Sequence, residues 1–215
     1  MTFIELATTI VILGSLLFMT LRGTVAIESM RAIAVGYQLT NYQQAVLGYQ
    51  VEYRQLPGDD PNASTRWKRN PAMTLLDRGS SVSLAGNGQI DGQLYDPRNP
   101  ASETLVAWQD LRLGGKLDGD ILSTGIASLP ENPFGGFYAF DEGNLGQSAG
   151  SLCATRIPGR AAESIDRRID DGKISTGKLV ATSKFDIAKN QHFDAPDSEP
   201  YDFEKEYIIC VPILP

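Results

Sequence analysis

The chain has 215 residues and a formal net charge of −7, a size that fits one globular domain with an extended element attached. Residues 1–54 carry equal numbers of acidic and basic side chains, so the acidic surplus lies on residues 55–215. Phosphate binding needs clustered Lys and Arg, and this balance argues against a nucleic-acid partner. The sole histidine, His192, sits in a polar segment where we expect a solvated or capping role. No P-loop, GxSxG or dinucleotide fingerprint occurs, so we expect no enzyme.

The first 22 residues form an apolar run with a single carboxylate, Glu5. From Leu6 to Leu21 no side chain is charged. A lone ionisable group at membrane depth is costly and points to a functional role. Its cheapest neutralising partner is an amino terminus, its own or that of a neighbour, which suits a subunit stored in a membrane and later packed against copies of itself.

Two ordinary explanations of this run are a secretory signal and a simple membrane anchor. A signal peptide has a basic region before its apolar core, whereas here Arg22 follows the run and nothing basic precedes it. A transmembrane helix needs ~20 apolar residues, which residues 3–21 nearly supply. A simple anchor would leave Glu5 without a purpose.

The segment Met1-Thr2-Phe3-Ile4-Glu5-Leu6 resembles the mature N-terminus of type IV pilins and pseudopilins, whose usual form is Phe-Thr-Leu-Ile-Glu-Leu. The resemblance implies a leader removed by a prepilin peptidase, N-methylation of Met1, and pairing of Glu5 with the amine of an adjacent subunit. Residues 164–177 and the Leu-Pro-Gly-Asp-Asp at 56–60 also look like segments of a subgroup of prepilin-type proteins.

Residues 1–54 predict one long helix, because no proline interrupts them. At 1.5 Å per residue it would be roughly 80 Å long, so its first half must project from any small domain. We expect residues 1–24 to anchor in the membrane before assembly and to form the filament core afterwards. Residues 25–54 should pack on a sheet through apolar positions at helical spacing, with polar residues facing outward. The expected packing positions are Val25, Ile27, Met30, Ile33, Ala34, Tyr37, Val46, Tyr49 and Tyr53, and the outward ones Gln38, Asn41, Gln44 and Glu52.

Gly14 and Gly23 bracket the weakest stretch of this helix, since glycine costs roughly 1 kcal/mol against alanine in a helix interior. In similar filaments the corresponding segment unwinds on assembly, and Arg22 stands where those proteins have a proline. The alternative is close helix packing through small residues.

Residues 55–215 predict a C-terminal globular domain. The turn cluster at 55–62 ends the helix, and residues 55–100 should form a long irregular connection. Short helices are expected at 102–113 and 160–169, a turn into a strand at 133–140, and further strands at 152–157, 178–183 and 207–214, with Pro212 favouring an edge or a bulge in the last. The expected fold is therefore α+β: a long pilin-like N-terminal helix packed on a small antiparallel sheet with long irregular loops.

Only two cysteines occur, Cys153 and Cys210, and their spacing excludes a CxxC redox or zinc pair. In an exported protein we expect them to form one disulfide, and similar proteins commonly tie down their C-terminal region in this way. Two buried free thiols are the alternative.

Acidic turns are the candidate cation sites. Asp118 and Asp120 are the first choice for calcium, with Asp91, Asp96, Asp170 and Asp171 as further oxygen ligands, although none fits the EF-hand spacing. Pseudopilins of secretion systems bind calcium in their C-terminal loops. Turn and capping roles are the alternative. No other cofactor is expected.

The resulting hypothesis is a structural pilin subunit that polymerises into a helical extracellular filament. Its expected partners are copies of itself, the inner membrane before assembly, the prepilin peptidase and the pilus assembly machinery. A minor pilin or a type II secretion pseudopilin fits the same residues. A protein of another class, a membrane-anchored periplasmic domain that binds a ligand, would have no use for Glu5. Adhesion, motility, DNA uptake and secretion use the same subunit plan.

Overall fold

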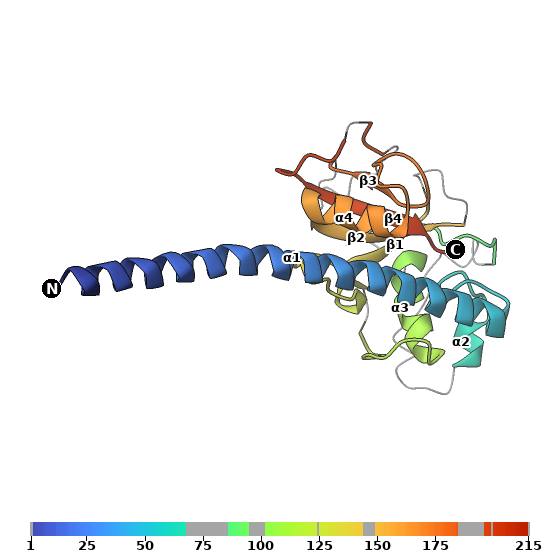
Figure 1. Ribbon diagram of the computed structural model, residues 1–215. Helices are drawn as coiled ribbons and strands as arrows, with labels where there is room; N and C mark the ends of the chain where they lie inside the picture. Colours follow the sequence, from blue (N-terminus) through green and yellow to red (C-terminus); the bar gives the residue numbers. More distant parts are fainter. Residues whose placement is uncertain are drawn as a thin grey trace.

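The computed structural model describes residues 2–67, 86–94, 102–123, 125–143, 149–184, 196–198 and 200–214. Its strands form a four-stranded antiparallel sheet of order β1-β2-β4-β3, with helices packed against it, which confirms the α+β class. Figure 1 shows α1 running past the globular part and projecting well beyond it. The elements are α1 (Phe3–Tyr53), α2 (Ala63–Arg66), α3 (Glu103–Leu113), η3 (Gly125–Ser128), β1 (Tyr138–Asp141), β2 (Ser151–Pro158), α4 (Gly159–Ile169), β3 (Val180–Thr182) and β4 (Glu206–Pro212).

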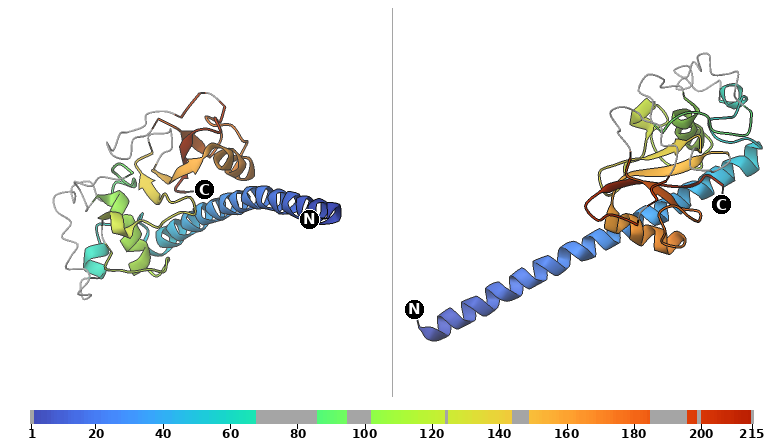
Figure 2. Two further views of the ribbon diagram at one scale, coloured as in Figure 1. Left: turned by 90° about the vertical axis from the view of Figure 1, so that its left-hand side faces the viewer. Right: turned by 90° about the horizontal axis from the view of Figure 1, so that it is seen from above.

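Helix α1 is continuous over 51 residues. At its start the backbone N–H of Thr2 donates a 2.8 Å hydrogen bond to Glu5 Oε2, so the carboxylate closes the first turn. At its end Arg54 adopts a left-handed conformation, φ 60°, and its N–H donates to the carbonyl of Gln50. The two views in Figure 2 show that only the C-terminal half of α1 lies against the rest of the chain.

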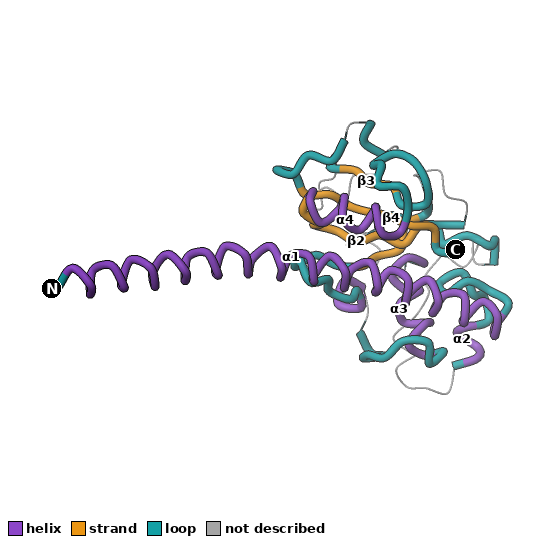
Figure 3. Tube along the Cα trace, viewed as in Figure 1, coloured by secondary structure: helices purple, strands orange, loops and turns teal. Residues whose placement is uncertain are grey.

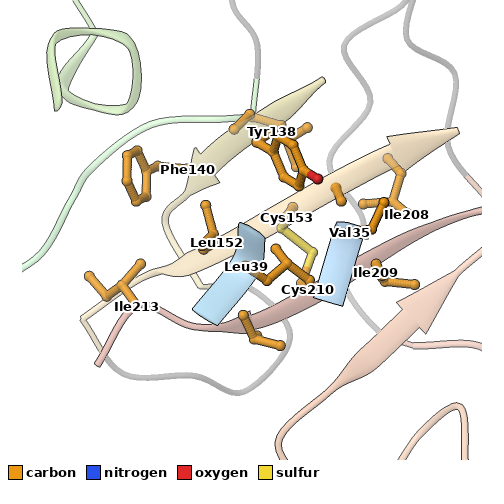
Figure 4. Close-up of a cluster of buried hydrophobic side chains, with 14 of the residues drawn as sticks. Val35, Leu39, Tyr138, Phe140, Leu152, Cys153, Ile208, Ile209, Cys210 and Ile213 are labelled. Atoms are coloured by element: carbon orange, nitrogen blue, oxygen red, sulfur yellow. A yellow bond between two sulfur atoms is a disulfide. The ribbon is translucent and has the colours of Figure 1, made fainter. Parts of the chain in front are cut away.

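The packing face of α1 is formed by residues at helical spacing that are buried against the sheet and the other helices. These are Ala32, Val35, Leu39, Ala45, Val46 and Tyr49. Figure 4 shows Val35 and Leu39 beside the disulfide that joins β2 to β4. Helix α4 adds Ala161, Ala162 and Ile165 to the same core, and α3 adds Trp108. Full burial of a large apolar side chain contributes ~1.5–3 kcal/mol to the stability of the fold.

Cys153 and Cys210 are directly opposite one another in the β2–β4 register and form a disulfide. The prediction of one bridge is confirmed, and the alternative of two free thiols is wrong. A bulge follows on β2 between Ala154 and Ile157, where Arg156 has a φ of 57°.

The expectation that Pro212 favours an edge strand or a bulge is wrong. Strand β4 lies between β2 and β3, and the irregularity in its pairing with β2 lies between Ala154 and Ile157, away from Pro212. The physical reason is the length of β3, which pairs only with residues 208–210 of β4. Pro212 lies beyond that pairing, so its missing N–H removes no bond of the β3 ladder. Its carbonyl accepts a 2.6 Å hydrogen bond from Gln43 Nε2 on α1.

The turn after α1 is buried although its residues are polar. Gly58 has a φ of +86°, and a Cβ there would lie 2.4 Å from the carbonyl oxygen of Glu103, so only glycine fits without a shift. Asp59 accepts the backbone N–H groups of Gly86, Asn87 and Gly88. Asp60 accepts the hydroxyl of Tyr49 at 2.8 Å and pairs with Arg66. These contacts fix the end of α1 against α3 and α2.

Residues 55–100 contain the short helix α2, which the expected irregular connection did not include. The predicted helices at 102–113 and 160–169 are confirmed as α3 and α4, and the four predicted strands as β1 to β4. Long loops surround β3 on the side of the sheet away from α1 (Figure 3).

Candidate assembly surface

The N-terminal part of α1 is apolar and exposed. Among its described side chains, Phe3 is 89 % exposed, Ile4 71 % and Val11 70 %. Successive residues of a helix are 100° apart, so the exposed positions cover the whole circumference. A helix that is apolar all round is a buried helix in most proteins. The exposed residues in this half are Phe3, Ile4, Leu6, Ile10, Val11, Ile12, Leu13, Leu16 and Phe18, and we call residues 3–18 the free half of α1.

Within the part of the chain that the structure describes, no helix is both long enough and apolar enough to cross a membrane. The side chains at 17 and 19–24 lie outside the described residues. The predicted anchor, residues 1–24, includes these positions.

Glu5 is the one charged side chain on the free half, and it is exposed. Its described hydrogen bond comes from the N–H of Thr2, which is a helix-capping contact. Its expected partner Met1 lies outside the described residues. The pairing of Glu5 with an amine therefore stays a prediction.

Gly14 and Gly23 both lie within the continuous helix α1. A Cβ at Gly14 would meet nothing within 4 Å, so this glycine makes no close contact inside the chain. Unwinding at these positions was expected for the assembled state, and it stays a prediction.

The second half of α1 carries two apolar faces, which the sequence analysis did not separate. Val46 and Tyr49 are buried as expected, but Met30 is 62 % exposed, Ile33 43 % and Tyr37 67 %. The assignment of Met30, Ile33 and Tyr37 to the packing face is wrong, because the sheet and α4 occupy the face of Val35 and Leu39 instead. Val25 and Ile27, also expected to pack, are exposed as well. We call Met30, Ile33 and Tyr37 the outer stripe. Gln44 and Glu52 are exposed as expected, whereas Gln38 and Asn41 are half-buried.

Two of the acidic residues expected to hold calcium, Asp120 and Asp171, accept hydrogen bonds within their own turns. Asp120 accepts the N–H of Leu122 at 2.8 Å and the hydroxyl of Ser123 at 3.1 Å. Asp171 accepts the N–H of Lys173 and the hydroxyl of Thr176. Carboxylates bonded to backbone two residues on are the pattern of Asx turns. Asp96 and His192 lie outside the described residues.

One group of carboxylates could hold a cation among the described residues: oxygen atoms of Asp166, Asp170 and Asp171 lie within 4.8 Å of one another. Asp118 and Asp120, the first choice from the sequence, do not belong to it. Asp166 accepts the N–H of Gly172, and Asp170 those of Lys178 and Leu179. The three carboxylates therefore already hold the loop that follows α4.

Comparison with known proteins adds no functional assignment. The chain matches no family model, no curated protein and no solved structure. What its surface does must therefore follow from the residues themselves. Among the described residues, large apolar side chains are exposed around the whole circumference of α1 at residues 3–18.

Proposed function

We propose that this protein is a structural subunit that polymerises into a helical extracellular filament of the type IV pilus kind. The observation that carries the proposal is the free half of α1, which is apolar on every side and projects from the globular part (Figure 1). The resemblance of residues 1–6 to mature pilins supports the same function. A minor pilin or a secretion pseudopilin would use this helix in the same way.

Relative to exposure in water, burial of the free half is a sufficient driving force for association. Relative to the inner membrane, where lipid already covers this helix, the gain comes from packing between helices. The nine exposed large apolar side chains of the free half would contribute ~1.5–3 kcal/mol each on full burial from water, or roughly 14–27 kcal/mol together. Association of two proteins costs ~4–15 kcal/mol in lost freedom. One neighbour covers only one side of a helix, so complete burial needs several copies around each free half. A helical array of identical subunits meets this requirement.

Glu5 sets the register of that array. In a dry core its carboxylate needs a cation, and the N-terminal amine of an adjacent subunit is the nearest one in such a packing. A buried ion pair adds little net stability, but an unpaired buried charge costs several kcal/mol. Registers that leave Glu5 unpaired are therefore penalised. When Glu5 pairs with the amine of the neighbouring subunit, it loses the hydrogen bond from the N–H of Thr2. Loss of this capping bond costs ~1 kcal/mol.

Before assembly, residues 1–24 hold the subunit in the inner membrane, where the prepilin peptidase and the assembly machinery act on it. In the assembled filament, the acidic surplus on residues 55–215 faces outward. A like-charged outer surface keeps finished filaments apart and soluble.

The proposal is tested by substitutions at Glu5 that separate charge from helix capping. Glu5→Gln keeps an oxygen that can accept the Thr2 N–H, and Glu5→Leu removes it. We expect both variants to insert into membranes normally and to yield few or no filaments, because both lack the charge. The matched control is Glu204→Gln, which removes one exposed carboxylate from the globular part and should assemble normally.

Wild-type filament yield from Glu5→Leu would contradict the proposed role of Glu5. Absence of filaments from the wild-type chain itself would favour a membrane-anchored periplasmic domain, which has no use for this carboxylate. Wild-type yield from Glu5→Gln alone would show that capping, rather than charge, is what assembly requires.

A further inference from the structure

Helix α4 lies along α1 (Figure 1) and runs in the same direction. At the start of α4, Arg160 and Ala161 line a groove together with residues of α1 between 25 and 32. At the end of α4, Cδ1 of Ile169 lies 3.8 Å from the place where a Cβ on Gly36 would be. The first turn of α4 is therefore the end of this helix that lies nearer the projecting part of α1.

The turn before β4, residues 202–205, adds an exposed aromatic side chain at the same end. The N–H of Gly159, the first residue of α4, donates a 2.9 Å hydrogen bond to the carbonyl of Lys205, so this turn is held against the start of α4. Phe203 in the turn is 48 % exposed. Cζ of Arg160 lies 5.1 Å from the centroid of its ring, a cation–π distance.

We propose that Phe203 and Arg160 contact the headgroup layer of the membrane while the subunit is stored there. The ring of Phe203 enters the boundary between headgroups and acyl chains, and the guanidinium of Arg160 donates to a headgroup phosphate. The inference rests on the proposed function, and it names the part of the globular domain that touches the membrane before assembly.

The first argument is position along α1. The uncharged run ends at Leu21, and the helix continues without a break beyond it. At 1.5 Å per residue, Val25 lies ~6 Å beyond Leu21. The headgroup region on each side of a bilayer is about 5–8 Å thick, since the whole bilayer measures ~40–45 Å and its hydrocarbon core ~30 Å. Arg160 lines the same groove as Val25. It therefore lies near the level of the headgroups when the uncharged run fills the hydrocarbon core.

The second argument is side-chain chemistry. Aromatic rings and arginine suit a membrane surface, because their apolar parts enter the acyl boundary while charged groups stay with the phosphates. Two neighbouring basic residues are already ion-paired, Lys205 with Asp202 at 3.5 Å and Arg156 with Glu206 at 3.6 Å. The described contact of Arg160 is with a neutral ring. Its charge is therefore available to a phosphate.

The contact does not require an anionic membrane. Glu28 lines the same groove as Arg160, and Glu204 follows Phe203 in the turn. These carboxylates offset the attraction of the basic residues to an anionic leaflet. Insertion of one ring and one contact between Arg160 and a phosphate can occur at any phospholipid. We therefore expect the same contact with zwitterionic and with anionic vesicles.

The test is tryptophan fluorescence of the full chain in vesicles of phosphatidylcholine, with and without phosphatidylglycerol. Phe203→Trp places a tryptophan at the contact, and phospholipids brominated on their acyl chains close to the headgroup quench a tryptophan that reaches them. The matched control is Val51→Trp on α1, 66 % exposed and ~45 Å beyond Leu21 at 1.5 Å per residue. Wild type supplies the emission of Trp67 and Trp108 for subtraction. Flotation of the chain with the vesicles checks insertion.

We expect the emission added by Phe203→Trp to be quenched and shifted to shorter wavelength, and the emission added by Val51→Trp to show neither change. Combining Phe203→Trp with Arg160→Glu should reduce the quenching, because an anion then lies beside the phosphates. Arg168→Glu, an exposed position near the other end of α4, should leave it unchanged. Quenching that Arg160→Glu does not reduce would overturn the phosphate contact.

The remaining outcomes separate the headgroup contact from polymerisation. Chains that float with the vesicles and form filaments in cells, while Phe203→Trp is quenched no more than Val51→Trp, would overturn the contact and leave the proposed function standing. Quenching without filaments in cells would retain the contact and overturn polymerisation. Chains that neither float nor form filaments would overturn both, and failure to float would overturn the contact even where filaments form.

Discussion

The hydroxyl of Tyr201 donates a 2.8 Å hydrogen bond to Oδ2 of Asp166, which is completely buried near the end of α4. Burial raises the pKa of this carboxyl to about 6, because the charged form loses its hydration. The hydrogen bonds from Tyr201 and from the N–H of Gly172 favour the charged form and offset only part of that effect. Asp166 thus links α4 to the following loop and to the segment before β4. The free-energy cost of burying its charged carboxylate depends on pH.

We predict that the contribution of Asp166 to the free energy of unfolding falls as pH rises from about 4 to about 6. An unfolded aspartate has a pKa of about 3.9, so in this window the folded chain holds a proton that the unfolded chain has lost. The contribution is fully present below pH 4 and lost above the folded pKa of about 6. It amounts to roughly 3 kcal/mol, at about 1.4 kcal/mol per pKa unit.

Urea unfolding at pH 4.5 and pH 7.5 measures this effect when wild type is compared with Asp166→Asn. Asparagine keeps an oxygen that can accept a hydrogen bond but does not titrate, so the variant should lose less stability between the two pH values. Other carboxylates contribute equally to both proteins. An identical pH dependence in the two would show that Asp166 titrates normally.

The two apolar faces of α1 predict opposite sensitivities to truncation. Leu39 is completely buried, and Leu39→Ala should lower the free energy of unfolding by ~2–5 kcal/mol through the cavity it leaves. Tyr37, two residues earlier, is 67 % exposed, and Tyr37→Ala should change the free energy of unfolding by about 0.5 kcal/mol or less. Fluorescence of the buried Trp108 reports unfolding in both variants. Equal losses would mean that α1 packs through a different face.

Removal of the disulfide should destabilise the sheet. The bridge joins residues 57 apart, and closing a loop of that size stabilises by ~4 kcal/mol in the chain-entropy model. We expect Cys153→Ala/Cys210→Ala to lose ~2–5 kcal/mol, measured by chemical unfolding. Chemical reduction of wild type is the matched control and should give a similar loss. An unchanged unfolding midpoint in both would mean that burial of β2 and β4 alone holds the strands together.

Sequence patterns were sufficient where one local signal dominates. Helix α4 has a polar outer face, and apart from Asp166 its buried residues are small or branched, so this helical periodicity predicts its bounds. The apolar run of β4 identifies a buried strand in the same way. The two cysteines also limited the choice to one bridge or none.

Patterns failed where the outcome depends on a distant partner. Both Tyr37 and Leu39 are apolar positions on α1, and only the location of the sheet decides which is covered. Asp59 looks like an ordinary turn residue, yet it is completely buried because the N–H groups of residues 86–88 surround its carboxylate. Asp166 is one of several acids near a turn, and its burial depends on Tyr201, 35 residues away.

The most direct test of polymerisation is electron microscopy of material sheared from cells that make the protein, with mass spectrometry of its N-terminus. We predict filaments built from this chain, beginning at an N-methylated Met1. Sheared material without such filaments, and the chain found only in membranes with further sequence still attached before Met1, would contradict assembly and favour a membrane-anchored periplasmic domain.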